Sequence, residues 1–439
     1  MANPITFLGA PVNITPIDDG TWRTVDVSAH VPSGASGVLL RSRFSDASSV
    51  DQIGFRKTGS TDTYQAAHTA TPSYVYTMIG LSASRQLDIL VENGGAGACT
   101  IELLAYFDPA SVVFFDNAAL LDTVAQSTWV DLDVTAAVDA VNSSDTAIAA
   151  ILYLHTTRAN ATEIGFRKNG SSQDVRASHA ASTGGRYIGC VIVPLDAGEI
   201  FEGWRASDAY GDFKMVGYVK ANFVGVDPAV DVSPGSTGAW TDITQAGALA
   251  QMIYAFTASD TQQMGLRKNG DSSTVGYGIV EANTGVSSRL PALVECDGSG
   301  VIEGQVDNLA VKLYRGGYFV AAGVGGPSIT DVEDESFRVG ETGIDVTGTG
   351  FGATQDTGFV RVCPSDDIDD VNGVNLTVTT WTDTGITFDV PGTLPLTFPR
   401  FTNVYLFVQN DGGLSNAAGY VVQITPHPAV LAYAAGLFG

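Results

Sequence analysis

The sequence predicts an all-β protein built from tandem β-sandwiches. Glycine is unusually frequent, at 50 residues, and it accompanies many Ser, Thr, Asn and Asp residues, which favour tight turns. Short apolar segments with period-two alternation recur along the chain, whereas helix-period segments are almost absent. The first three quarters of the chain also repeat with a period of about 100 to 110 residues, the size of one domain.

An octapeptide marks the repeats most clearly. Its copies are Ile53–Ser60, Ile164–Ser171 and Met264–Asp271. A tryptophan precedes each copy, and these are Trp22, Trp129 and Trp240. An apolar segment with a tyrosine closes each repeat: Ile101–Phe107, Phe213–Val219 and Leu309–Tyr314. We therefore expect three jelly-roll-like sandwiches over residues 20–110, 111–226 and 227–322, joined by short Gly/Pro hinges such as the one at Asp227-Pro228.

The octapeptide begins as a strand and ends as a turn. Ile-Gly-Phe-Arg-Lys has hydrophobic residues at its first and third positions, and Asn-Gly then predicts a hairpin. Thr58-Gly59 is a poorer turn pair, so we expect a different turn in the first copy.

The charged positions of the octapeptide have two interpretations. They belong to the fold, or they form a ligand site in each repeat. The residues concerned are Arg56, Lys57, Arg167, Lys168, Arg267 and Lys268. The tryptophans are likewise either core residues or platforms on which a sugar ring stacks. Because these features recur in every copy, the fold is the simpler explanation.

Two segments have a helical period. Ala136–Ala140 and Gln245–Gln251 each predict about one or two helical turns.

Residues 323–425 follow a different pattern. Ile344 and Val346 alternate on one face of a strand, as do Ile386 and Phe388. Three segments carry a family resemblance: Pro327–Gly352, Thr380–Pro391 and Val404–Gly413. They resemble an IPT/TIG domain, and a Gly-Thr-Gly-Phe-Gly turn is the most specific part. The resemblance implies an immunoglobulin-like sandwich that acts as a spacer or interaction module and supplies no catalytic residues.

Charge and cysteine content limit the partners. The net charge of −25 is spread along the chain without a basic patch, so neither nucleic acid nor an anionic membrane is expected as a partner. No segment approaches the roughly 20 apolar residues that span a bilayer. The four cysteines lie far apart at unmatched positions of the repeats: Cys99, Cys190, Cys296 and Cys363. We expect free, mostly buried thiols and folding in a reducing cytoplasm.

The sequence contains no recognisable catalytic motif. Neither a metalloprotease His-Glu-x-x-His, a Gly-x-Ser-x-Gly nor a Cys/His zinc spacing occurs, so we expect no enzymatic activity and no cofactor. The best metal candidates lie in one acidic loop: Asp366, Asp367, Asp369 and Asp370. Such a loop suits Ca²⁺, but Thr377 stands where an EF-hand requires glutamate, and a solvated loop is the alternative.

One terminus is expected to anchor the protein while the other projects, and both are candidates. Residues 1–19 predict an N-terminal arm, and residues 426–439 predict an apolar tail that docks on a neighbouring molecule. The anchoring side chains of the tail are Leu431, Tyr433, Leu437 and Phe438. The N-terminus lacks the basic and apolar regions of a signal peptide.

The octapeptide repeats followed by an immunoglobulin-like domain resemble modules of structural proteins in tailed bacteriophages. The resemblance implies a tail fibre or appendage that folds in the host cytoplasm, lies on the virion surface and contacts host glycans. Its expected partners are tail or capsid proteins and further copies of the chain in a homo-oligomer. A capsid decoration protein is the close alternative. A carbohydrate-binding accessory protein and an adhesin are the non-viral alternatives.

Overall fold

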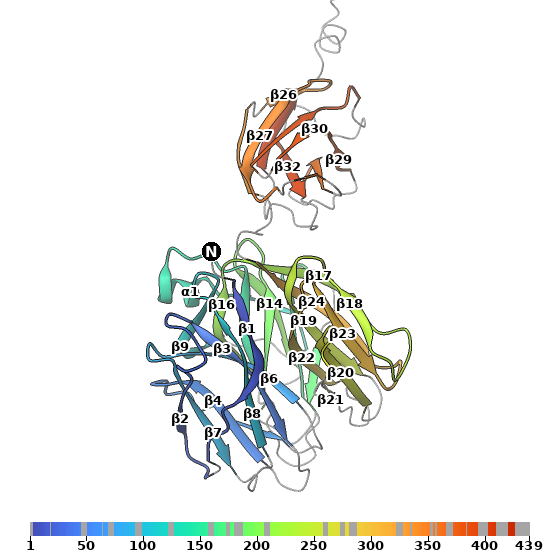
Figure 1. Cartoon of the computed structure of the whole chain (residues 1–439). Helices are drawn as coiled ribbons and strands as arrows, with labels where there is room; N and C mark the ends of the chain where they lie inside the picture. Colours follow the sequence, from blue (N-terminus) through green and yellow to red (C-terminus); the bar gives the residue numbers. More distant parts are fainter. Residues whose placement is uncertain are drawn as a thin grey trace, which may run out of the picture. The chain divides into compact units, whose positions relative to one another are not determined.

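The computed structural model divides the chain into two compact units, residues 1–322 and 323–439 (Figure 1). It describes residues 3–17, 19–44, 51–63, 65–68, 74–92, 99–121, 127–156, 162–172, 176–179, 188–205, 211–257, 262–272, 277–280, 288–321, 328–333, 336–351, 354–355, 358–365, 372–382, 384–393, 403–409 and 420–425.

The first repeat is a sandwich of two four-stranded sheets. We call the sheet with the order β1-β8-β3-β6 inner and the sheet with the order β2-β7-β4-β5 outer. The strands are β1 (Ile5–Asn13), β2 (Arg23–Asp26), β3 (Gly37–Phe44), β4 (Asp51–Lys57), β5 (Gln65–His68), β6 (Tyr74–Gly80), β7 (Gln86–Glu92) and β8 (Cys99–Phe107). This strand order is that of a jelly roll.

The second repeat has the same topology. Its inner sheet is β9-β16-β11-β14 and its outer sheet is β10-β15-β12-β13. The strands are β9 (Val112–Leu121), β10 (Val130–Asp133), β11 (Ala149–Thr156), β12 (Thr162–Lys168), β13 (Arg176–His179), β14 (Ile188–Pro194), β15 (Ile200–Arg205) and β16 (Gly211–Val219).

The third repeat completes the series, with the inner sheet β17-β24-β19-β22 and the outer sheet β18-β23-β20-β21. The strands are β17 (Phe223–Asp231), β18 (Thr241–Thr244), β19 (Ala248–Thr257), β20 (Gln262–Lys268), β21 (Tyr277–Val280), β22 (Ser288–Glu295), β23 (Val301–Val306) and β24 (Lys312–Val320). The prediction of an all-β fold with jelly-roll-like sandwich repeats is thus confirmed.

Two expected boundaries are corrected by the first strands of the repeats. Ile5–Asn13, expected in an arm, forms β1 and pairs with β8, and Asp227-Pro228, expected at a hinge, lies inside β17. Each of these strands is bulged in the middle, which interrupts the alternation that would have marked it as a strand. A proline is tolerated there because these are edge strands.

The helical expectations have different outcomes. Helix α1 (Thr135–Asn142) covers Ala136–Ala140 as predicted. The helix expected at Gln245–Gln251 is wrong: the Ala248 amide closes a turn onto the Gln245 carbonyl, and β19 begins at Ala248. The apolar residues there pair with β22 and β24, so strand pairing overrides a short helical period.

The three repeats share one hydrophobic core. The equivalent strands β6, β14 and β22 contact one another in pairs, which arranges the repeats as a ring with approximate threefold symmetry. The ring of Phe107 in the first repeat lies 5.6 Å from that of Phe114 in the second and 6.2 Å from that of Phe319 in the third. Ser178 of β13 pairs with Ser288 of β22, which joins two sheets into one of eight strands.

The second unit is also a two-sheet sandwich. Its sheets have the orders β25-β27-β31-β30 and β26-β33-β32-β28-β29. The strands are β25 (Ser328–Val332), β26 (Ser336–Arg338), β27 (Ile344–Thr349), β28 (Phe359–Cys363), β29 (Val374–Asn375), β30 (Thr377–Trp381), β31 (Gly385–Asp389), β32 (Asn403–Gln409) and β33 (Tyr420–Thr425). Ile344, Val346, Ile386 and Phe388 are buried in its core, as their alternation predicts.

All four cysteines are buried free thiols, as expected. Among the described residues no helix is long and apolar enough to cross a membrane.

Candidate functional site

The charged residues of the octapeptide belong to a cluster that recurs in every repeat. In the third repeat the Arg267 guanidinium lies 3.9 Å from the centre of the Trp240 ring, and its Nε donates a hydrogen bond to Glu303 Oε2 at 2.7 Å. The first-repeat cluster has Arg56 at 4.2 Å from Trp22 and 3.2 Å from Asp88 Oδ2. The second has Arg167 at 4.2 Å from Trp129 and 2.6 Å from Glu202 Oε2.

Each Trp–Arg–carboxylate cluster links adjacent strands of an outer sheet. Trp240 precedes the edge strand β18, Glu303 lies on the neighbouring strand β23, and Arg267 lies on β20. Gly265, the second residue of the octapeptide, must be glycine because an added Cβ would lie 2.6 Å from Trp240 Cη2. The shared Ile/Met-Gly-Phe/Leu-Arg sequence therefore has a structural cause.

The turn that follows is the same in all three repeats. Gly59, Gly170 and Gly270 have φ of +93°, +78° and +76°, and each turn is closed by a hydrogen bond to the carbonyl of the octapeptide lysine. The expectation of a different turn in the first copy is wrong, since only the glycine needs a positive φ and Thr58 fits as well as asparagine. The tight hairpin expected at this turn does not form in the second repeat. The pairing of β12 with β13 ends at Gly165 and Arg176, before the turn at Gly170.

The side chains before the turn glycines bind carboxylates of their own outer sheet or its adjoining turn. Asn169 Nδ2 donates to Asp196 Oδ2 at 2.7 Å, and Thr58 Oγ1 donates to Asp88 Oδ1 at 3.0 Å. The guanidinium also covers one face of each half-buried tryptophan. These contacts favour the structural interpretation for the arginines, the tryptophans and the turn residues over a ligand site.

Three junctions join the repeats, and we name them 1/2, 2/3 and 3/1 after the repeats they connect. At junction 1/2, Phe114 lies over Gly80, where an added Cβ would be 2.7 Å from Phe114 Cβ. At junction 2/3 the sizes are reversed, and a Cβ on Gly225 would be 2.5 Å from Pro194 Cβ. By strand register Phe114 is equivalent to Gly225, and Gly80 to Pro194. Both junctions are closed by a large side chain against a glycine.

Polar contacts add to the closure of junction 1/2. Lys57 Nζ lies 2.6 Å from Asp116 Oδ1 in the bulge of β9. The neighbouring Asn117 Oδ1 accepts hydrogen bonds from Ser60 Oγ at 3.0 Å and from the Thr61 amide at 2.9 Å. The turn of the first repeat is thereby fixed to the first strand of the second.

Junction 2/3 has corresponding contacts. Ser171 Oγ donates to Asp227 Oδ1 at 2.5 Å, again between a turn and a bulged first strand. Tyr254 Oη donates to the Ile192 carbonyl of the second repeat at 2.9 Å. Tyr153, the equivalent residue one repeat earlier, reaches a carbonyl of the first repeat at 3.5 Å.

Junction 3/1 keeps the phenylalanine of junction 1/2 and differs at the other positions. The equivalent residues there are Phe7, Gly9, Ala10, Arg41 and Glu295. Two large side chains, Phe7 and Glu295, stand where the other junctions pair a large residue with glycine. Gly9 and Ala10 offer no side-chain acceptor to the turn of the third repeat, and Arg41 replaces the bridging tyrosine.

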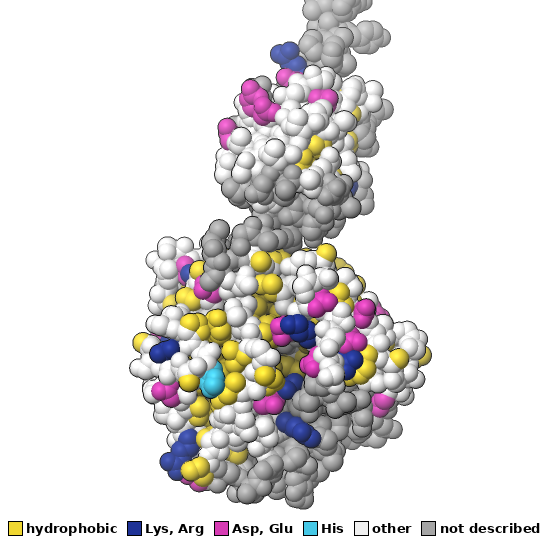
Figure 2. Space-filling view, in the orientation of Figure 1, with side chains coloured by type: hydrophobic (Ala, Val, Ile, Leu, Met, Phe, Trp, Pro, Cys, Tyr) yellow, Lys and Arg dark blue, Asp and Glu magenta, His cyan; other side chains and the backbone are white. Residues whose placement is uncertain are grey.

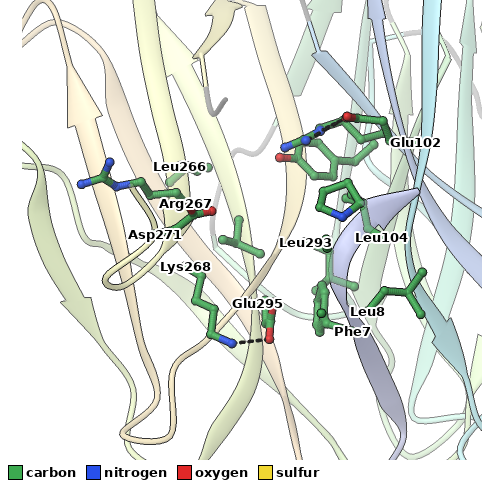
Figure 3. Close-up of a pocket in the computed structure, with 16 residues that line it drawn as sticks. Phe7, Leu8, Glu102, Leu104, Leu266, Arg267, Lys268, Asp271, Leu293 and Glu295 are labelled. Carbon is green, nitrogen blue, oxygen red and sulfur yellow. Dashed lines mark hydrogen bonds and ion pairs between the residues drawn. The ribbon is translucent and has the colours of Figure 1, made fainter. Parts of the chain in front are cut away.

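A groove of about 600 Å³ remains at junction 3/1, whereas the corresponding cavity at junction 2/3 measures about 20 Å³. Figure 3 shows Phe7 and Leu8 of β1 on one side and Leu266 of β20 on the other. Leu104 adds further apolar surface to the lining.

Two ion pairs lie along the groove (Figure 3). Arg41 Nη2 lies 2.7 Å from Glu102 Oε2, and Lys268 Nζ lies 2.5 Å from Glu295 Oε1. Burial by itself would lower the pKa of Arg41. The interactions with Tyr76 and Glu102 outweigh burial and raise the pKa above its usual value, so the guanidinium stays charged. In Figure 2, hydrophobic side chains between β1 and β20 are flanked by charges of both signs.

Several expected site residues fall outside the described residues. They are the calcium candidates Asp366, Asp367, Asp369 and Asp370 and the tail residues Leu431, Tyr433, Leu437 and Phe438. Among the described residues, no group of three or more His, Cys, Asp or Glu side chains is arranged to hold a metal ion.

Comparisons with known proteins add little. No family model and no curated protein matches the chain. A fungal alcohol oxidase of the AA5 family in complex with copper is 10% identical, with a TM-score of 0.20, over 92% of this chain and 99% of that one. The tandem CBM22 domain of Paenibacillus barcinonensis Xyn10C is 7% identical, with a TM-score of 0.13, over 49% of this chain and 94% of that one. Likenesses at this level carry no argument about function.

Proposed function

We propose that this chain is a structural protein on the surface of a tailed-bacteriophage virion, a tail fibre or appendage with a role in host attachment. Its partners are tail proteins, further copies of the chain and host surface glycans. The phage resemblance of the repeats and the IPT/TIG resemblance of the second unit motivate the proposal.

The observation that supports it best is how the shared residues of the repeats are used. The Trp–Arg–carboxylate clusters link strands within each outer sheet, and Phe107, Phe114 and Phe319 join the repeats into one core. The recurring clusters and the shared core thus build a rigid scaffold, which suits display, and leave recognition to surfaces that differ between the junctions.

Negative-stain imaging of intact particles labelled with an antibody against the chain tests the proposal. We expect label on the tail or at its tip. Label over the head would instead identify a capsid decoration protein. Particles without label would overturn the virion proposal and favour a carbohydrate-binding accessory protein or an adhesin.

A further inference from the structure

We propose that the groove at junction 3/1 is a binding site for a neutral saccharide. The inference deepens the attachment role and rests on that proposal for the source of the sugar. The site itself is argued from the geometry of the first unit.

The groove results from coordinated differences at one junction. Phe7 matches Phe114, but the residue opposite it is Glu295 and not glycine. Gly9 and Ala10 leave space in the groove. Arg41 and Glu295 form ion pairs within their own repeats. The chain's other two junctions show that these sandwiches can pack closely. A volume of about 600 Å³ also lies in the usual range of small-ligand sites.

The charges of the groove favour a neutral ligand. Its cationic residues, Arg41, Arg267 and Lys268, are matched in number by Glu102, Asp271 and Glu295. The chain as a whole carries −25, which disfavours an anionic ligand further. Glu102 and Glu295 already lie beside cations, which weakens the attraction for a cationic ligand.

The hydrogen-bonding groups favour a ligand that both donates and accepts. A carboxylate can accept about four hydrogen bonds and an ammonium can donate three, so the contacts of Lys268 with Glu295 leave capacity for hydroxyl groups. Phe7 and Leu104, which are only partly buried, offer apolar surface to the C–H face of a ring. Hydroxyl groups around an apolar ring face are the chemistry of a neutral sugar.

The decisive variant adds to the lining of the groove the two side chains that stand at the equivalent positions of junction 1/2. In the double substitution Gly9→Asp and Ala10→Asn, residues equivalent to Asp116 and Asn117 face the third repeat. An added Cβ at Gly9 has nothing within 4 Å, so the site accommodates the larger side chain. Asn117→Ala, at the closed junction 1/2, is the matched control.

The full-length chain is applied to an array of immobilised neutral and acidic oligosaccharides, and the best neutral binder is then titrated calorimetrically. We expect the double variant to bind at least tenfold more weakly and Asn117→Ala to bind within twofold of the parent. Lys268→Ala, whose side chain is 42% exposed, should keep the fold and bind three- to tenfold more weakly.

Undiminished binding by both groove variants, binding of acidic sugars alone, or no binding to the array would overturn the site. The particle-labelling experiment is independent of this result. A labelled virion without sugar binding would refute the groove alone, and sugar binding without a labelled particle would refute only the virion role.

Discussion

The outer sheets and the junctions of the first unit are built on different rules. The outer sheets carry the same cluster three times, with arginine-to-tryptophan distances between 3.9 and 4.2 Å. The junctions use different residues at equivalent places: Phe114 against Gly80, Gly225 against Pro194, and Phe7 beside Glu295. Each sandwich is thus specified by common residues, while the order of the sandwiches in the ring is specified by residues that differ.

The largest effect is expected when a side chain of the first repeat that contacts the other two repeats is removed. Phe107→Ala should lower the free energy of unfolding by about 3–5 kcal/mol, because Phe107 is fully buried between Phe114 and Phe319. Denaturant unfolding should show all three repeats destabilised in one transition. Phe337→Ala, equally buried in the second unit, is the control and should affect only the transition of that unit. Loss of the first repeat alone would contradict a shared core.

A smaller loss of stability is expected when one outer-sheet cluster is disrupted. Arg267→Ala should cost about 2 kcal/mol, since it uncovers Trp240 and leaves Glu303, which is 14% exposed, without its ion pair. Arg167→Ala should cost the same within about 0.5 kcal/mol if the clusters are equivalent. A double-mutant cycle with Glu303→Gln measures the coupling. Values that differ widely between the repeats would break the comparison.

The outer-sheet features were largely predictable from the sequence, because they are local. The octapeptide strand, its glycine turn and the repeat period all follow from neighbouring residues. The cluster partner was not identified, because Glu303 lies 36 residues from Arg267 and its contact depends on strand register. The strand β1 was missed because Gly9, Ala10 and Pro11 form a bulge without alternation.

The junctions could not be predicted in the same way. An apolar face that packs on another repeat has the same composition as a face buried within one sandwich, so the shared core left no separate signal. Aligning the first strands of the repeats would have shown Gly9 against Asp116 and Asp227. Arg41 likewise stands against Tyr153 and Tyr254. Such departures within a repeat family are the signal that could have located the groove.

Alkaline pH probes junction 1/2 through a buried thiol. Burial raises the pKa of Cys190 from 9.0 to about 12, and its Sγ lies 3.4 Å from the Met78 carbonyl of the first repeat. The unfolded thiol ionises first, so the stability that this group contributes is present below pH 9 and is lost as pH rises toward 12. At pH 10 the loss should be about 1–2 kcal/mol.

Urea unfolding of the parent and of Cys190→Ala at pH 8 and pH 10 measures this loss. The substitution leaves a small cavity at both pH values, so the difference between pH values isolates the thiol. The pH dependence of the variant should be smaller by the stated amount. An identical pH dependence would mean that Cys190 ionises as easily in the folded chain.

The smallest effects are expected at the polar contacts of junction 1/2. Two substitutions there compare buried hydrogen bonds with an exposed ion pair. Asn117→Ala should cost about 1 kcal/mol, because it removes the acceptor of Ser60, which is buried, and of the Thr61 amide. Lys57→Met should change stability by less than about 0.5 kcal/mol, since Asp116 is 84% exposed and water screens the pair. Urea midpoints at low and high salt distinguish the two, because only the lysine variant should lose a salt-dependent term. If Lys57→Met proved the more damaging change, the ion pair and not the hydrogen bonds would close junction 1/2. Junction 3/1 would then be open because Gly9 stands where junction 1/2 has the carboxylate of Asp116.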